Sequence, residues 1–124
     1  MVLKRTISSL FFVCINYQIL LNINIISWGD IMNEVSIYEM KDKENIIDIR
    51  DNYSYNLGHL ANSKNIPYYS LISNFSLYLN KNTAYYLYCD HGNQSKELSS
   101  RLNLFGYKTY YVKEGYLDFK NKIK

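Results

Sequence analysis

Three short apolar runs, separated by segments with helical spacing, constrain the fold of this chain more than any other feature. The runs lie at residues 46–49, 84–88 and 109–112, and each is rich in β-branched or aromatic side chains. Such runs predict buried strands. Apolar residues three or four positions apart around residues 69–77 and 98–105 predict helices between the strands. Strands that alternate with helices at this spacing predict an α/β fold with a mainly parallel sheet.

Single residues mark where the predicted helices begin and end. Pro67 can begin the first helix, because its missing N–H costs nothing there. Asn80 and Asn82 are typical turn residues. Ser95 is a candidate N-cap for the second helix. Gly106 fits the position just past its end, because only glycine enters the left-handed conformation freely.

Cys89 lies at the predicted end of the second strand, and a polar loop and a helix follow it. Open α/β sheets bind their ligands at this edge. The N–H groups of the loop and of the helix start carry partial positive charge, which favours a thiolate over a thiol. Gly92 fits such a loop, because inward-pointing N–H groups need a residue without Cβ. The pattern favours a nucleophilic thiol over the alternative, a buried cysteine beside an ordinary turn.

Two other compositional features exclude classes of function. The cysteines, Cys14 and Cys89, are too few for a disulfide framework, and no Cys/His cluster has zinc-site spacing. The net charge is only +3, and a nucleic-acid surface needs a dense basic stripe. A loose basic group near the C-terminus is typical of a solvated helix face. Its members are Lys113, Lys120, Lys122 and Lys124.

Residues 1–31 form an apolar segment that admits three interpretations. No charged residue occurs in residues 7–29, which are long enough to span a bilayer, and Lys4 and Arg5 precede them. This outline fits a membrane anchor or a cleaved signal peptide. Against an anchor, several amide side chains interrupt the segment, and these are costly in hydrocarbon. They are Asn16, Gln18, Asn22 and Asn24.

The third interpretation is an untranslated leader, with translation starting at Met32. Back-translation of Gly29-Asp30 permits GGA-GAT, a ribosome-binding sequence just upstream of Met32. We therefore predict a domain at residues 32–124 that acts in the cytoplasm, with anchoring through residues 7–29 as the alternative. N-terminal mass spectrometry distinguishes them, because any native peptide from residues 6–31 excludes the leader.

Six short motifs occur in order between Ser36 and Phe119. They are Asp48-Ile49-Arg50, Tyr55-Asn56-Leu57-Gly58-His59-Leu60, Asn65-Ile66-Pro67, Tyr88-Cys89-Asp90-His91-Gly92-Asn93-Gln94-Ser95, Phe105-Gly106-Tyr107 and Glu114-Gly115-Tyr116. Each alone is weakly specific, but together they resemble the motifs of rhodanese-like sulfurtransferase domains of the single-domain type. The resemblance implies a five-stranded, mainly parallel sheet with helices on both sides.

The resemblance also implies a chemistry centred on Cys89. This cysteine would accept a sulfane sulfur, become a persulfide, and pass the sulfur to a thiol or another nucleophile. The donor would be a small persulfide or thiosulfate. The acceptor would be a thiol, on a small molecule or on another protein. The resemblance implies no metal and no organic cofactor. Arg50 would line the cleft, or instead pair with Asp48 or Asp51. The active-site loop would comprise Asp90, His91, Gly92, Asn93, Gln94 and Ser95.

Loop length and one substitution refine this prediction. The loop from Cys89 to Gln94 has six residues, which resembles the sulfur-transferring branch rather than the related phosphatases with their seven-residue loop. Gln94 stands where the family usually has Arg, so the positive fork that would bind thiosulfate is lost. We therefore expect weak use of thiosulfate. The alternative is a non-catalytic module of the same fold that binds or regulates a partner.

One matching residue and two departures concern structure rather than chemistry. His59 could serve as a general base, but we expect it to hold a turn. Asn62 stands where the family commonly has Gly, and Asn tolerates the left-handed conformation, so the turn should survive. Phe119 replaces the usual Trp and should change the core packing only mildly.

Overall fold

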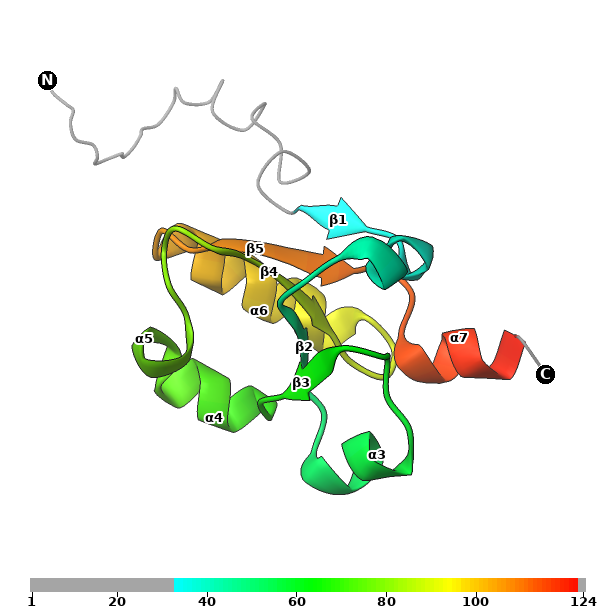
Figure 1. The fold of residues 1–124 in the computed structure, drawn as a ribbon. Coiled ribbons are helices and arrows are strands. Elements are labelled where there is room, and N and C mark those ends of the chain that lie inside the picture. Colours follow the sequence, from blue (N-terminus) through cyan, green and yellow to red (C-terminus); the bar gives the residue numbers. More distant parts are fainter. Residues whose placement is uncertain (1–32, 123–124) are drawn as a thin grey trace, which may run out of the picture. The chain divides into compact units, whose positions relative to one another are not determined.

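Five parallel strands form the central sheet of the computed structural model, which describes residues 33–122 (Figure 1). The strands are β1 (Glu34–Val35), β2 (Ile46–Asp48), β3 (Ser63–Asn65), β4 (Ala84–Tyr88) and β5 (Lys108–Val112), in the spatial order β1-β5-β4-β2-β3. The three apolar runs are therefore confirmed as β2, β4 and β5. Every strand pair is parallel, so the sheet is wholly rather than mainly parallel. In the central pair, Asp48 of β2 stands opposite Tyr88 of β4.

The two strands that the sequence pattern missed lie at the edges of the sheet. β3 consists of Ser63, Lys64 and Asn65 and pairs only with β2. β1 has two residues and pairs only with β5. An edge strand needs no apolar run on both faces, so its sequence carries little of the signal that identifies a central strand.

Six helices connect and cover the strands in the described part of the chain. They are the 3₁₀ helix η1 (Ile37–Asp42), α3 (Asn52–Leu57), α4 (Tyr68–Ser73), α5 (Phe75–Tyr78), α6 (Asn93–Leu104) and α7 (Tyr116–Lys122). The helix expected around residues 69–77 is broken into α4 and α5, because Asn74 leaves the helical conformation with φ −139° and ψ 40°. The solvated C-terminal helix is α7, which has no buried residue.

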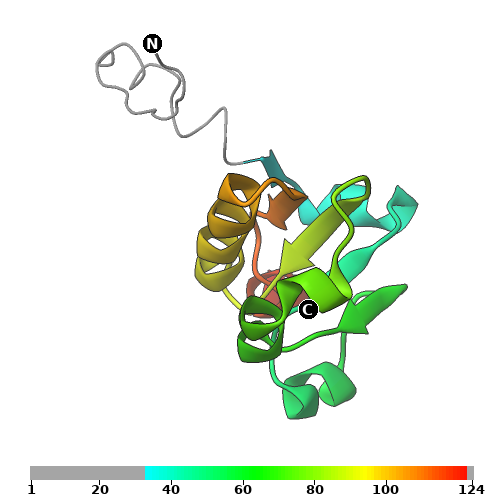
Figure 2. The ribbon, with the colours of Figure 1, turned by 90° about the vertical axis from the view of Figure 1, so that its left-hand side faces the viewer.

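Helices lie on both sides of the sheet, as expected (Figure 2). A separate apolar cluster covers each face. One cluster joins β2 and β4 to α4 and α6, with Leu71, Leu98 and Leu102 almost fully buried. The other joins the opposite face to η1 and α7. Phe119 packs against this second cluster and meets the Tyr38 ring edge-on at 5.6 Å.

A glycine lies at each end of helix α6, and the one at its start corrects the prediction that Ser95 is the N-cap. Gly106 has φ +97°, and the N–H groups of Gly106 and Tyr107 donate to Asn103 and Leu102, so the predicted helix end is confirmed. Ser95 is not the N-cap: that position belongs to Gly92, with φ +90°. A glycine in the left-handed conformation turns the chain into the helix three residues earlier, which places Ser95 inside the first turn.

The predictions for residues 1–31 fall outside the described residues. Of the helices that the structure describes, none combines the length and the apolar character needed to cross a bilayer.

The turn at Asn62 has the expected conformation. Asn62 has φ +70°, so the left-handed turn predicted there is present.

Candidate functional site

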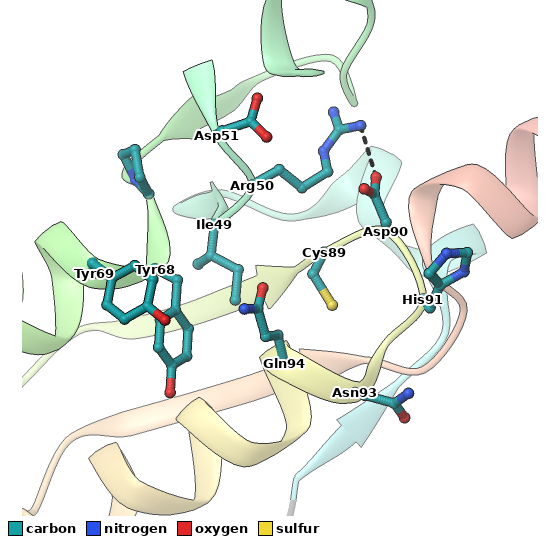
Figure 3. A pocket seen from close by; sticks show the side chains of 11 residues that line it. Ile49, Arg50, Asp51, Tyr68, Tyr69, Cys89, Asp90, His91, Asn93 and Gln94 are labelled. Atoms are coloured by element: carbon teal, nitrogen blue, oxygen red, sulfur yellow. Dashed lines mark hydrogen bonds and ion pairs between the residues drawn. The ribbon is translucent and has the colours of Figure 1, made fainter. Parts of the chain in front are cut away.

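A pocket of about 440 Å³ opens at the carboxyl edge of the sheet, where β2 and β4 end (Figure 3). Parallel neighbours bring the residues that follow them to the same edge. Its wall consists of Ile49, Arg50, Asp51, Pro67, Tyr68, Tyr69, Cys89, Asp90, His91, Asn93 and Gln94. The structure thus gathers Cys89, Arg50 and most of the predicted loop around one cavity.

The Cys89 side chain is buried, and its sulfur lies among hydrogen-bonding groups. The N–H of Gly92 donates to Sγ at 3.2 Å and the N–H of Ser95 at 3.4 Å. The thiol also lies 3.4 Å from Ser95 Oγ, to which it donates, and that hydroxyl donates to the Gly92 carbonyl at 3.2 Å. A sulfur anion at this position would keep both N–H donors and could gain the hydroxyl as a third.

Two glycines allow the loop to take this shape. A Cβ on Gly92 would lie 2.6 Å from the carbonyl oxygen of Lys113, closer than real Cβ contacts. At Gly115 the space for a Cβ is already filled by the backbone of Asp90 and His91. The segment after β5 therefore lies directly against the loop, and the N–H of Tyr116 donates to the Cys89 carbonyl at 2.8 Å.

Arg50 is a buried cation that is paired on two sides. Its guanidinium binds the Asp48 carboxylate through Nε and Nη2, at 2.8 to 3.1 Å, and Asp90 through Nη1 at 3.1 Å. Nη2 also donates to the Gly58 carbonyl at 2.6 Å, and the group lies 4.4 Å from the centre of the Tyr116 ring. Burial opposes the charge, but hydrogen bonds and attraction to Asp48 outweigh it, so the pKa of Arg50 is raised above its ordinary value.

Both alternatives for Arg50 thus hold in the structure, because it lines the pocket and also pairs with Asp48. Asp51 has another partner: its carboxylate caps α3 by accepting from the N–H of Ser54 at 2.8 Å. That hydrogen bond is the main reason why the pKa of Asp51 is lowered. The partnership between Arg50 and Asp90 was not predicted, since 40 positions separate them.

The remaining loop residues differ in how they face the cavity. Gln94 points into the pocket, whereas the side chain of Asn93 points away from Cys89 (Figure 3). His91 is mostly exposed, and its Nδ1 lies 3.3 Å from a carboxylate oxygen of Asp118 on α7. Gln94 thus supplies an amide, but no charge, where the family's Arg would stand.

The sequence does not predict two residues of the pocket wall, and it places His59 outside the chemistry. Tyr68 and Tyr69 form one wall of the pocket, and their only signal is that they follow the Asn65-Ile66-Pro67 motif. His59 lies outside the pocket, where its Nδ1 is 2.8 Å from the Tyr55 carbonyl and its ring stacks on that of Tyr55. This contact agrees with the expected structural role in a turn.

Glu114, in the last of the six motifs, links two distant segments of the chain. Its carboxylate accepts from the N–H of Ile37 at 2.8 Å and from the Ser36 hydroxyl at 3.3 Å, which ties the start of η1 to the segment after β5.

Within residues 33–122, no three His, Cys, Asp or Glu side chains gather closely enough to hold a metal ion.

Comparison with known proteins places this geometry in a family. Residues 35–122 match the family model described as "Rhodanese-like domain". A rhodanese-like domain protein from Staphylococcus aureus is 27% identical with a TM-score of 0.61, and the match covers 68% of this chain and 87% of that one. A rhodanese-related protein from Thermoplasma volcanium is 25% identical with a TM-score of 0.64, covering 73% and 92%.

A human single-domain sulfurtransferase shares the fold at 17% identity, with a TM-score of 0.56 over 72% of this chain and 96% of that one. No match was found among curated proteins. The family model covers most of the chain, and the pocket and loop occupy the expected edge of the expected sheet. The chain therefore belongs to the family of rhodanese-like domains, which is related to sulfurtransferases.

Proposed function

We propose that this protein is a sulfurtransferase or persulfide carrier that moves sulfane sulfur through a persulfide on Cys89. One observation carries the proposal. The Cys89 sulfur lines an open pocket, and the N–H groups of Gly92 and Ser95 point at it from 3.2 and 3.4 Å. Such donors stabilise the thiolate that attacks and the persulfide anion that forms.

The transfer takes place in two balanced steps. In the first, the Cys89 thiolate attacks the sulfane sulfur of the donor and a new sulfur–sulfur bond forms. The donor's own sulfur–sulfur bond breaks, and its other part leaves with the electron pair, as sulfite from thiosulfate or as a thiol from a persulfide. In the second step, an acceptor thiolate attacks the outer sulfur and Cys89 leaves as the thiolate.

The pocket favours persulfide donors over thiosulfate. Gln94 brings no charge, and Arg50 is already bound by the carboxylates of Asp48 and Asp90. Thiosulfate carries two negative charges and binds best to an unoccupied guanidinium fork. An alkyl persulfide carries at most one negative charge and needs no such fork, so it is the donor class that we propose.

Intact-protein mass spectrometry tests the proposal directly. The protein would be incubated with thiosulfate, cysteine persulfide or glutathione persulfide, and each sample compared with the Cys89→Ser variant. The expected result is a gain of about 32 Da, one sulfur atom, on wild type only, and most completely with a persulfide. Transfer of that sulfur to added thiol, with loss of the gained mass, completes the test.

The absence of an Arg at Gln94 favours one second candidate, a non-catalytic rhodanese-fold module that binds or regulates a partner. This candidate predicts no adduct from any of the three donors, although the domain remains folded. An adduct that persists in Cys89→Ser would also count against the sulfurtransferase, because the sulfur would then be carried elsewhere.

We further propose that the protein acts in the cytoplasm and that the acceptor is a thiol, on a small molecule or on another protein. The cytoplasm keeps thiols reduced, so both Cys89 and its acceptor would remain nucleophilic there. A protein acceptor would meet Tyr69 at the pocket wall, where this side chain is 76% exposed.

A further inference from the structure

The Arg50–Asp90 ion pair lies in the wall of the pocket that also holds Cys89. Arg50 is the one side chain with a permanent positive charge among the described residues that line the pocket. Its side chain is 5% exposed, and that of Asp90 is 34% exposed. Asp90 is therefore the more exposed carboxylate partner of Arg50, whereas Asp48 is fully buried.

Hydrogen bonding leaves the Arg50 guanidinium little capacity to bind a donor. Nε donates to Asp48, Nη2 donates to Asp48 and to the Gly58 carbonyl, and Nη1 donates to Asp90. A guanidinium has five N–H groups, and these bonds engage one on Nε, two on Nη2 and one on Nη1. A bidentate fork for an oxyanion is thus not offered to the pocket.

The charges around Arg50 favour donors of low negative charge. Asp48 and Asp90 bind the Arg50 guanidinium, and a third carboxylate, that of Asp51, belongs to the same pocket wall. A dianion that enters such a pocket meets a net negative charge, while a neutral or singly charged persulfide meets much less repulsion.

We propose that Asp90 is a specificity-determining residue, which by pairing with Arg50 excludes dianionic sulfur donors and admits persulfides of low charge. This inference rests on the proposed sulfur transfer and names the residue that selects its substrate class. Asp90 immediately follows the nucleophile, and both residues belong to the wall of the pocket that a donor would enter.

The kinetic test is the ratio of two specificity constants in the Asp90→Asn variant. Asn keeps the shape of the side chain and removes the charge. The ratio of kcat/KM for thiosulfate to kcat/KM for cysteine persulfide should rise about tenfold or more, which corresponds to the loss of one repulsive charge near a dianion. The matched control is Asp118→Asn, because Asp118 is an exposed carboxylate beside the loop that pairs with His91 and not with Arg50.

A binding measurement keeps this inference separate from the proposed function. In a Cys89→Ser background no transfer occurs, so titration calorimetry with thiosulfate reports binding alone. The dissociation constant should fall about tenfold with Asp90→Asn and stay unchanged with Asp118→Asn. Equal thiosulfate affinity with and without the Asp90 charge overturns the inference, whether or not the wild type carries sulfur. A wild type that takes sulfur from no donor overturns the proposed function instead.

Discussion

The hydroxyl oxygen of Ser95 lies 3.4 Å from the sulfur of Cys89, and both side chains are buried. The same hydroxyl donates to the Gly92 carbonyl at 3.2 Å. A hydroxyl can rotate, so it accepts from the thiol and can donate to a thiolate. Ser95 thus contacts the sulfur through both its backbone and its side chain, although it is not the helix cap that the sequence suggested.

The first prediction is that Ser95→Ala slows alkylation of Cys89 by iodoacetamide about threefold. The variant lacks a hydroxyl that can donate to the attacking thiolate, and the greater nucleophilicity of a less stabilised thiolate offsets part of the lost rate. The free energy of unfolding should fall by about 1 kcal/mol, because a buried hydrogen bond is lost.

The control for this experiment is Ser99→Ala. Ser99 lies one turn later on α6, is equally buried, and bonds to Thr109 at 2.9 Å rather than to the sulfur. It should lose similar stability at an unchanged alkylation rate. If both variants alkylate at the same rate, the Ser95 hydroxyl has no role at the sulfur.

The second prediction compares two glycines that share a left-handed backbone. Gly92→Ala should cost about 2–4 kcal/mol of unfolding free energy, because the new Cβ meets the Lys113 carbonyl at 2.6 Å in addition to the backbone strain. Gly106→Ala should cost only about 1 kcal/mol, because its Cβ would meet the flexible Lys81 side chain at 3.5 Å. Urea unfolding measures both, and equal losses would show that the contact with Lys113 is relaxed at little cost.

The third prediction is that Gln94→Arg raises kcat/KM for thiosulfate about tenfold or more. The new guanidinium would bring a charge and a bidentate fork into the pocket. Asn93→Arg adds the same charge one residue earlier, where the side chain points away from Cys89 (Figure 3), and it should give a much smaller gain. Unchanged thiosulfate turnover in Gln94→Arg would contradict the role that we assign to the missing charge.

The fourth prediction concerns the pH dependence of stability at Asp51. The hydrogen bond from the Ser54 N–H lowers the pKa of Asp51 in the folded protein. A lowered pKa gives a stabilisation that is present above the unfolded value, about 3.9, and is lost as the pH falls through the folded value. Asp51→Asn keeps a capping oxygen but cannot titrate.

The stability advantage of wild type over Asp51→Asn should therefore shrink as the pH is lowered from about 6 to about 3. Urea unfolding of both proteins across that range measures the difference in their free energies of unfolding. The contributions of the other carboxylates largely cancel in this difference. A difference that stays constant with pH would mean that the carboxylate titrates alike in the folded and unfolded chains.

The features predicted correctly from sequence are those that depend on neighbours along the chain. The strand runs 84–88 and 109–112 are apolar because the strands are buried, and Gly106 ends α6 because of its own conformational freedom. The features missed depend on contacts across the fold. Ser63 begins a strand that is polar because it lies at an edge, and the break at Asn74 has no glycine or proline to mark it.

The residues of the candidate site show the same division between local sequence features and contacts across the fold. A local motif identified the loop around Cys89, but it could not show that Ser95 faces the sulfur from inside the helix. The pairing of Arg50 with Asp90 joins two loops 40 positions apart, and the sequence predicts Asp48 or Asp51, not Asp90, as the partner of Arg50. Sequence therefore predicts the nucleophile, while the charge of its surroundings emerges only when the strands are assembled.

The register between β2 and β4 determines how mutations can change this pocket. Asp48 stands opposite Tyr88, so Arg50 and Asp90 each lie two residues beyond a matched pair and arrive at the sheet edge together. Insertion or deletion of one residue in either strand would part the two charges and turn alternate side chains to the opposite face. Under the function that we propose, substitution at position 90 or 94 can change the donor preference, whereas a change in strand length would separate the residues that form the pocket.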